Sequence, residues 1–270
     1  MGKPSGGLAA CVAAAAGEAK RLADLEVLMS FVISVYVREG IVMASDSRLT
    51  MTNRVDQGNQ QIHNIAVGQS DSNYKTFLTP SGVGISTYGN AMVAGAPIGG
   101  YVESFIEESS RGAKPAVACV AESLLLYFRT LDPGLQTYFY VAGYQPVDGG
   151  STEQQVWSVD IARNSAQQVI PNGTPGAIWG GESDVLARLV NPMFGVDQNN
   201  QPGQRLPDVQ IPFPFFTLQD AIDFSVFAVR STIDSIRFQP RAKTVGGPID
   251  VLIIKPSGAH WVQRKELTVG

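Results

Sequence analysis

Residues 30–48 read SFVISVYVREGIVMASDSR, beginning at Ser30 and ending at Arg48. Two apolar runs, 31–37 and 41–45, flank Glu39-Gly40, and such runs joined by a glycine-containing turn are typical of a β-hairpin. Because nearly every residue of both runs is apolar, we expect this hairpin to be covered on both faces. The polar residues 51–73 predict an exposed loop or a mobile excursion.

The rest of the chain alternates between groups of expected strands and groups of expected helices. Strands are expected near 75–78, 83–87, 137–143, 155–160, 176–179, 250–254 and 260–262. Helices are expected near 92–110, near 115–130, after Gly181, and from a capping box of Thr217 and Asp220 to about Phe238. Residues 195–214 contain four prolines and predict a surface loop. This order predicts an α+β sandwich with helices outside two strand-rich layers.

The composition argues against several classes of partner. The chain has 270 residues, a net charge of −4 and a pI of about 5.2, without a run of Lys or Arg. Neither nucleic acid nor a membrane surface is therefore an expected partner. Cys11 and Cys119 form no disulfide framework, which fits a reducing cytoplasm, and we expect Cys119 to be a buried thiol. His63 and His260 are isolated, so no metal site is expected.

Residues 1–28 differ from the remainder of the chain. They are rich in Ala and Gly, and 18–27 form a helix-favouring stretch, whereas β-branched and aromatic residues dominate from Ser30 onward. The longest apolar run, Leu8–Ala16, is too short to span a bilayer. With Lys3 before it, this run leaves a signal peptide as an alternative.

The pattern over residues 30–48 resembles the start of mature proteasome β-subunits and related bacterial proteases, which are N-terminal-nucleophile hydrolases. Those chains begin with a Thr that opens an apolar strand, and a glycine turn and second strand then lead to Asp-Ser-Arg or a near variant. Here Ser30 takes the first position, and Asp46 follows sixteen residues later (46 − 30) without a gap. Gly40 matches the family's turn glycine, Asp46 its catalytic-site aspartate and Arg48 its following basic residue.

A second segment, residues 75–91, is similar to the part of the family that carries the catalytic lysine and the oxyanion-binding glycine. The resemblance assigns these roles to Lys75 and Gly89, with an insertion within 49–74 relative to typical β-subunits. Residues 231–237 and 245–253 are also similar to the bacterial proteins.

The resemblance has three departures, and the first is that Ser30 stands where the family has a Thr. The family's Gly-Ser-Gly stretch corresponds to Trp179-Gly-Gly-Glu-Ser183, so its serine is lost or displaced to Ser183. The acid near the end of the family's long helix is matched best by Asp234. These departures leave open a catalytically inactive member that serves as an assembly or binding module.

The resemblance implies that 30–270 form a single domain with a four-layer αββα sandwich, and that it hydrolyses peptide or other amide bonds. A serine hydroxyl needs a base, and a free α-amine on Ser30, titrating near about 7.7 to 8.0, would supply one. A nearby Lys75 ammonium would lower the pKa of that amine, and Asp46 would hold the lysine. The Gly89 N–H would bind the oxyanion, a contact worth about 3 kcal/mol. No cofactor is implied.

A free amine on Ser30 requires removal of residues 1–29, which we interpret as a propeptide or an upstream extension. Either the Met29–Ser30 bond is cut autocatalytically, or translation begins at Met29 and that residue is removed; both routes stay open. Family members assemble into rings, so a homo-oligomer is expected. A small-molecule amidase of the acylase type, which shares the αββα layers, is the remaining alternative.

Overall fold

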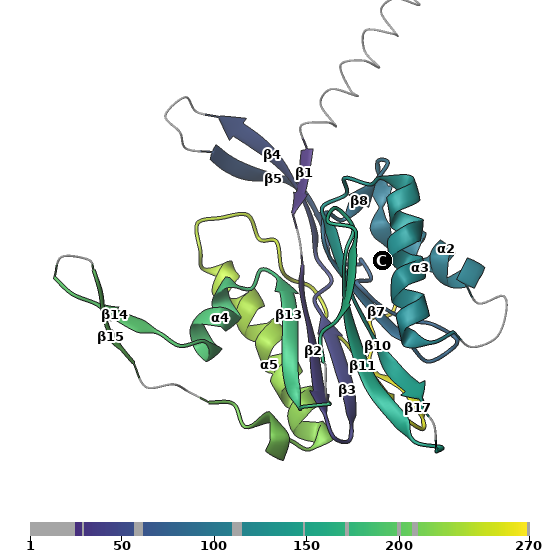
Figure 1. The fold of residues 1–270 in the computed structure, drawn as a ribbon. Helices are drawn as coiled ribbons and strands as arrows, with labels where there is room; N and C mark the ends of the chain where they lie inside the picture. Colours follow the sequence, from purple (N-terminus) through teal and green to yellow (C-terminus); the bar gives the residue numbers. More distant parts are fainter. Residues whose placement is uncertain are drawn as a thin grey trace, which may run out of the picture.

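The computed structural model describes residues 25–28, 30–56, 62–109, 115–147, 149–170, 173–198, 201–206 and 210–268. Over these residues the chain has a mixed α/β structure with four α-helices and several antiparallel sheets (Figure 1). No helix in this described part is long and apolar enough to cross a membrane. The predicted extension 1–29 lies outside the described residues except for 25–28.

One five-stranded sheet is built on the predicted hairpin of residues 31–45, which is confirmed. Its order is β13 (Gly176–Gly181), β2 (Phe31–Val37), β3 (Gly40–Ser45), β16 (Asp250–Lys255) and β17 (Gly258–Gln263). Every residue of β2 and β3 is buried, as the continuous apolar pattern predicts. Glycine is needed at the turn, because a Cβ at Gly40 would lie 2.9 Å from the Ile254 carbonyl oxygen.

The other five-stranded sheet has the order β12 (Ser165–Gln168), β11 (Thr152–Asp160), β10 (Thr137–Pro146), β7 (Gly84–Gly89) and β6 (Thr76–Leu78). All of these strands except β12 were expected from the sequence. The residues of β12 read SAQQ and carry no apolar alternation, so only their pairing with β11 identifies them as a strand.

The helices are α2 (Ile98–Ser109), α3 (Val117–Leu131), α4 (Asp184–Val190) and α5 (Leu218–Arg237). In Figure 1, α2 and α3 lie beside the sheet that contains β10, whereas α4 and α5 lie beside the sheet that contains β2. The predicted capping box at the start of α5 is confirmed, with Thr217 and Asp220 bonded reciprocally. Such a cap typically contributes about 1 kcal/mol to helix stability.

Three apolar clusters form the core. The first joins α2 and α3 to the β10 sheet, and the second joins α4 and α5 to the β2 sheet. The third combines side chains from both sheets, including Val32 and Met43 from one and Tyr140 and Val156 from the other. The two sheets are therefore held together by apolar side chains.

The prediction of a loop at 51–73 is wrong for most of its described residues. β4 (Leu49–Asp56) pairs with β5 (Ile62–Ser70), and β1 (Leu25–Leu28) pairs with the other edge of β4. Two paired strands satisfy the backbone hydrogen bonds of each other, so strands can form where the sequence shows no apolar alternation that would predict them. β1 also replaces the end of the helix expected over 18–27, whose residues 18–24 lie outside the described part.

Three other expectations need correction. The loop predicted at 195–214 contains the hairpin of β14 (Phe194–Val196) and β15 (Pro202–Arg205) and the 3-10 helix η1 (Phe213–Phe215). The helix expected from 92 begins at 98, because β8 (Met92–Val93) and β9 (Ala96–Pro97) pair around Gly95, whose φ is +82°. Cys119 lies on an exposed position of α3 and is not buried.

Candidate active site

Ser30 lies where the chain enters β2, and it is buried, with 2% of its surface exposed. Its φ of +22° lies outside the regions that residues with a Cβ prefer. Its carbonyl oxygen accepts a hydrogen bond from the Glu182 N–H at 3.0 Å. The residue that directly follows β13 thus fixes the position of the main chain at the start of β2.

The carboxylate of Asp46, directly after β3, is fully buried and accepts four hydrogen bonds. Its Oδ1 accepts from the Phe31 N–H at 2.9 Å and from Lys75 Nζ at 2.8 Å. Its Oδ2 accepts from the N–H groups of Arg48 and Gly246, each at 3.0 Å. Buried carboxylates need such partners, and this set fixes Asp46 between the start of β2 and the start of β6.

Lys75 directly precedes β6, and its side chain is 5% exposed. Burial lowers the pKa of the Lys75 ammonium, whereas the Asp46 carboxylate acts in the opposite direction. The ion pair with Asp46 supports the charged form at a position where an unpaired ammonium would be strongly disfavoured. The site therefore contains a desolvated cation at a defined place.

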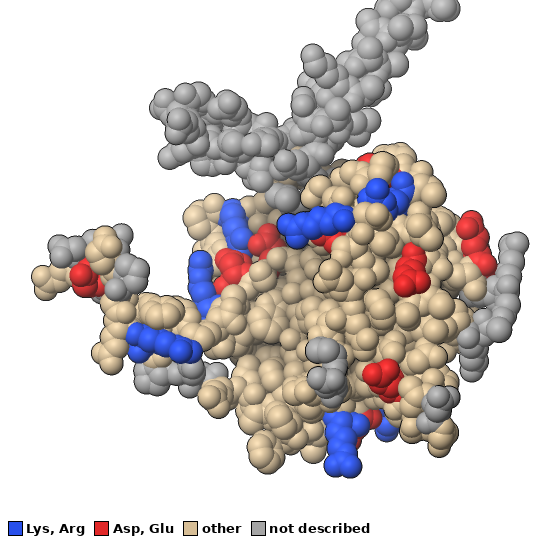
Figure 2. Space-filling model, in the orientation of Figure 1, with Lys and Arg blue, Asp and Glu red and all other residues tan. Residues whose placement is uncertain are grey.

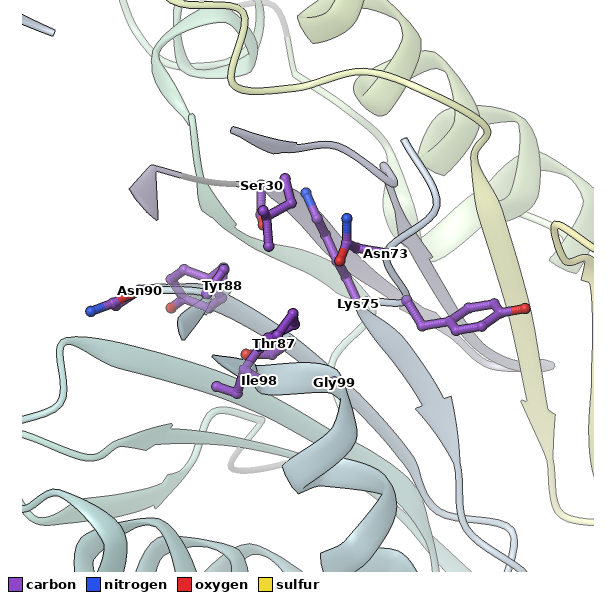
Figure 3. A pocket seen from close by; sticks show the side chains of 12 residues that line it. Ser30, Asn73, Lys75, Thr87, Tyr88, Asn90, Ile98 and Gly99 are labelled. Atoms are coloured by element: carbon purple, nitrogen blue, oxygen red, sulfur yellow. The ribbon is translucent and has the colours of Figure 1, made fainter. Parts of the chain in front are cut away.

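A pocket adjoins these residues. Figure 3 shows the Ser30 and Lys75 side chains reaching it from different segments of the chain. Its lining is formed by Ser30, Leu49, Asn73, Tyr74, Lys75, Thr87, Tyr88, Asn90, Ala91, Pro97, Ile98 and Gly99. The Thr87 hydroxyl is buried without a hydrogen-bond partner. The pocket thus combines apolar side chains with hydroxyl, amide and ammonium groups.

Gly89 ends β7 between two residues that line the pocket, Tyr88 and Asn90, although Gly89 is not itself among the lining residues. Its φ is +104°, and a Cβ there would lie 2.5 Å from the Gln136 carbonyl oxygen. The backbone at this position therefore requires glycine, independently of any part in chemistry.

The structure brings Ser30, Asp46 and Lys75 together, with Gly89 nearby, but it leaves Asp234 apart. Asp234 is exposed on α5 and is not among the residues lining the pocket. Ser183, the possible displaced serine, precedes α4 and also lies outside the lining.

Arg48, two residues after Asp46, is bonded through its side chain to a different aspartate, Asp71. Its guanidinium forms two hydrogen bonds with the Asp71 carboxylate, at 2.6 and 2.7 Å. These bonds raise the pKa of Arg48 and lower the pKa of Asp71. The side chain also packs against Gly246, where a Cβ would lie 2.4 Å from Arg48 Cζ. Arg48 thus supports the backbone that donates to Asp46.

Sequence reasoning missed a polar network behind Ser30. Glu182 accepts hydrogen bonds from Thr244 Oγ1 at 2.6 Å and from Arg241 at 2.9 Å. Because the Glu182 N–H also binds the Ser30 carbonyl oxygen, this network connects Ser30 to the segment between α5 and β16. No local pattern pointed to this network, since its members are far apart in sequence.

No protein-family model matches the chain, and no curated protein matches it significantly in sequence. In the part of the chain that the structure describes, no group of three or more His, Cys, Asp or Glu side chains is arranged to hold a metal ion.

Proposed function

We propose that the protein is an N-terminal-nucleophile hydrolase that cleaves peptide or other amide bonds with Ser30 as the nucleophile. The observation that carries this proposal is the buried Lys75–Asp46 ion pair, which adjoins the same pocket as Ser30. A buried ion pair is costly to form, and buried pairs with perturbed pKa values gather at functional sites. The hydrogen bond from the Phe31 N–H to Asp46 ties the pair to the residue after Ser30.

We further propose that the fold is the four-layer αββα sandwich of these hydrolases. Two observations support it: helices adjoin each five-stranded sheet, and a third apolar cluster combines side chains of both sheets. In such an arrangement the head of β2 and the end of β7 meet at one edge, where the candidate residues lie.

The proposed reaction begins with a free α-amine on Ser30. The amine takes the Oγ proton while Oγ forms a bond with the substrate carbonyl carbon, whose oxygen becomes an oxyanion. The carbon–nitrogen bond then breaks, and the leaving amine takes the proton from the Ser30 ammonium. Water, activated by the same amine, attacks the ester, releases the carboxylic acid and restores the Ser30 hydroxyl. The Gly89 N–H is proposed to stabilise the oxyanion.

Lys75 is proposed to act through its charge. An ammonium near the Ser30 amine lowers the pKa of that amine by like-charge repulsion and keeps more of it in the basic form at neutral pH. Asp46 keeps the lysine charged and fixes its position, because Oδ1 accepts from Lys75 Nζ at 2.8 Å.

We propose that removal of residues 1–29 from the domain releases the α-amine of Ser30. β1 pairs with β4 from Leu25 opposite Asn53 to Leu28 opposite Thr50, so the segment before the junction extends along the edge of β4. Such strand pairing would present the Met29–Ser30 bond to the site if autocleavage is the route.

We also propose a homo-oligomer. Large apolar side chains are exposed on several elements, including Phe194 of β14, Phe215 of η1, and Phe227 of α5. Figure 2 shows few charged side chains over the middle of the face in view. Exposed apolar surface of this kind marks interaction sites in folded proteins.

The test of the function is the intact mass of the purified protein with and without a peptide epoxyketone, which reacts with an α-amine and its neighbouring hydroxyl. The expected result is a chain that begins at Ser30 and gains one inhibitor mass, and a Ser30→Ala variant that gains none. A full-length chain without label would contradict the proposal and favour an inactive assembly or binding module.

A further inference from the structure

A second buried lysine–aspartate pair lies close to the first and has no part in the proposed reaction. Lys265 Nζ binds Asp250 Oδ2, and the two side chains are 4% and 0% exposed. The Lys265 N–H also donates to Asp250 Oδ1 at 2.7 Å. Both carboxylate oxygens are therefore held by one residue of the segment that follows β17.

The pairing of strands in the sheet places Asp250 near Asp46. Asp250 lies opposite Ser45 in the pairing of β16 with β3, and Ser45 directly precedes Asp46. The two buried carboxylates therefore belong to neighbouring positions of paired strands. The charges of the two pairs act on each other, since Asp46 contributes to the pKa of Lys265 and Lys265 to the pKa of Lys75.

Lys265 is also joined to the pocket through Tyr74, the residue before Lys75. Its carbonyl oxygen accepts from the Tyr74 hydroxyl at 3.2 Å, and its Nζ lies 4.3 Å from the centre of the Tyr74 ring. The neighbouring Arg264 stacks on the same ring at 4.8 Å. Because Tyr74 lines the pocket, the chain after β17 supports one of the pocket's walls.

Charged and titratable groups face Lys265 from several parts of the fold. They are Asp250 of β16, Asp46 after β3, Tyr74 and Lys75 directly before β6, and Arg264, which precedes Lys265 on the same segment. Burial lowers the pKa of Lys265, and the hydrogen bond to Asp250 opposes this effect. Lys265 in turn contributes to lowering the pKa of Lys75, although burial is the larger cause.

We propose that Lys265 is a positioning residue of the active site, which fixes Tyr74 and Lys75 in place and adds a second buried positive charge beside the Lys75–Asp46 pair. Its kinetic consequence rests on the proposed function, whereas its effect on Lys75 does not. The segment after β17 would thereby support a pocket whose lining residues lie between Ser30 and Gly99.

The test compares Lys265→Met with Lys265→Arg and with Lys255→Met, a matched control at the other end of β16. Two readouts are used: the pH profile of kcat/KM on a fluorogenic peptide, and the pKa of Lys75 followed by NMR of ¹³C-labelled lysine. Loss of a nearby positive charge makes protonation of Lys75 and of the Ser30 amine easier, so both pKa values should rise.

For Lys265→Met we expect the acid limb of kcat/KM to move up by about 0.5 to 1 pH unit, with a loss of about three- to tenfold at pH 7, mainly in kcat. Lys265→Arg should remain within about threefold of the wild type, because it keeps the charge. Lys255→Met should change neither readout. If Lys265→Met does not fold, Lys265→Gln removes the same charge and leaves Asp250 a neutral hydrogen-bond donor, so it should give the same shifts.

An unchanged Lys75 pKa together with an unchanged pH profile would overturn the proposal. A wild-type protein that hydrolyses nothing would refute the proposed function, but a raised Lys75 pKa in Lys265→Met would still support the coupling of the two pairs. The two failures are therefore distinguishable.

Discussion

Gly181 packs directly on the main chain of Ser30. A Cβ added at Gly181 would lie 1.7 Å from the Ser30 carbonyl oxygen, and the φ of Gly181 is +89°. Close contact and backbone conformation thus both require glycine at the end of β13. This contact, together with the hydrogen bond from Glu182, sets the path of the chain into the candidate site.

Gly181→Ala is therefore expected to destabilise the protein by about 2 to 5 kcal/mol, since strain and overlap both contribute. Urea unfolding would measure this loss. The control is Gly150→Ala, because Gly150 also has a positive φ, +79°, but nothing lies within 4 Å of its added Cβ. Equal losses in the two variants would show that the contact with Ser30 is unimportant.

Ser30→Ala should abolish hydrolysis and inhibitor labelling while leaving the unfolding midpoint nearly unchanged, because the hydroxyl alone is removed. Ser30→Thr should keep activity within about tenfold, since it retains the hydroxyl and the amine. Turnover assays and intact mass would measure both variants. Hydrolysis by the alanine variant at the wild-type rate would exclude Ser30 as the nucleophile.

Asp46→Asn should cost about 3 to 5 kcal/mol, because it leaves the Lys75 ammonium unpaired in the core and presents an amide N–H to donors. The control is Asp71→Asn, which breaks the pair with Arg48. The Asp71 side chain is 42% exposed, so its loss should cost no more than about 1 kcal/mol. Denaturant unfolding would compare the free energies of unfolding of the two variants. A similar loss in both would contradict the claim that the buried bonds of Asp46 stabilise the fold more than the exposed pair of Asp71 does.

The lowered pKa of Lys75 predicts how stability changes with pH. Its folded pKa lies below the ordinary value of 10.5, so the unfolded chain binds this proton more strongly. The free energy of unfolding should therefore rise with pH between the folded pKa and 10.5. The contribution is measured as the difference between the wild type and Lys75→Met in urea unfolding at several pH values. A difference that decreases with pH in this window would show that the pKa is raised.

Phe215→Asp should weaken the proposed oligomer without unfolding the chain, because Phe215 is 85% exposed. Sedimentation velocity would detect a shift to smaller species. Leu126→Asp is the control: Leu126 is exposed on α3, away from η1. Assembly that responds only to the Leu126 change would place the interface on the helical side formed by α2 and α3.

Local patterns made much of the fold predictable. The hairpin of β2 and β3 could be predicted because its residues are apolar throughout, and the start of α5 because a capping box is a contiguous signal. The ribbons of β4–β5 and β14–β15 could not, since their residues show no continuous alternation of apolar and polar side chains and only the strand pairing identifies them. Of the candidate site residues, Ser30 and Asp46 were predicted from the resemblance to the N-terminal-nucleophile hydrolases, whereas the distant partner Glu182 was not.

The sequence by itself determined the strands and helices with strong periodicity, because those depend on neighbouring residues. It also supplied Ser30, Asp46 and Lys75 as candidates. Only the tertiary structure decided that Lys75, 29 residues from Asp46, forms a buried ion pair with it, and that Lys265 forms another with Asp250. Such pairs depend on which segments the packed sheets exclude from water, and no local pattern encodes that exclusion.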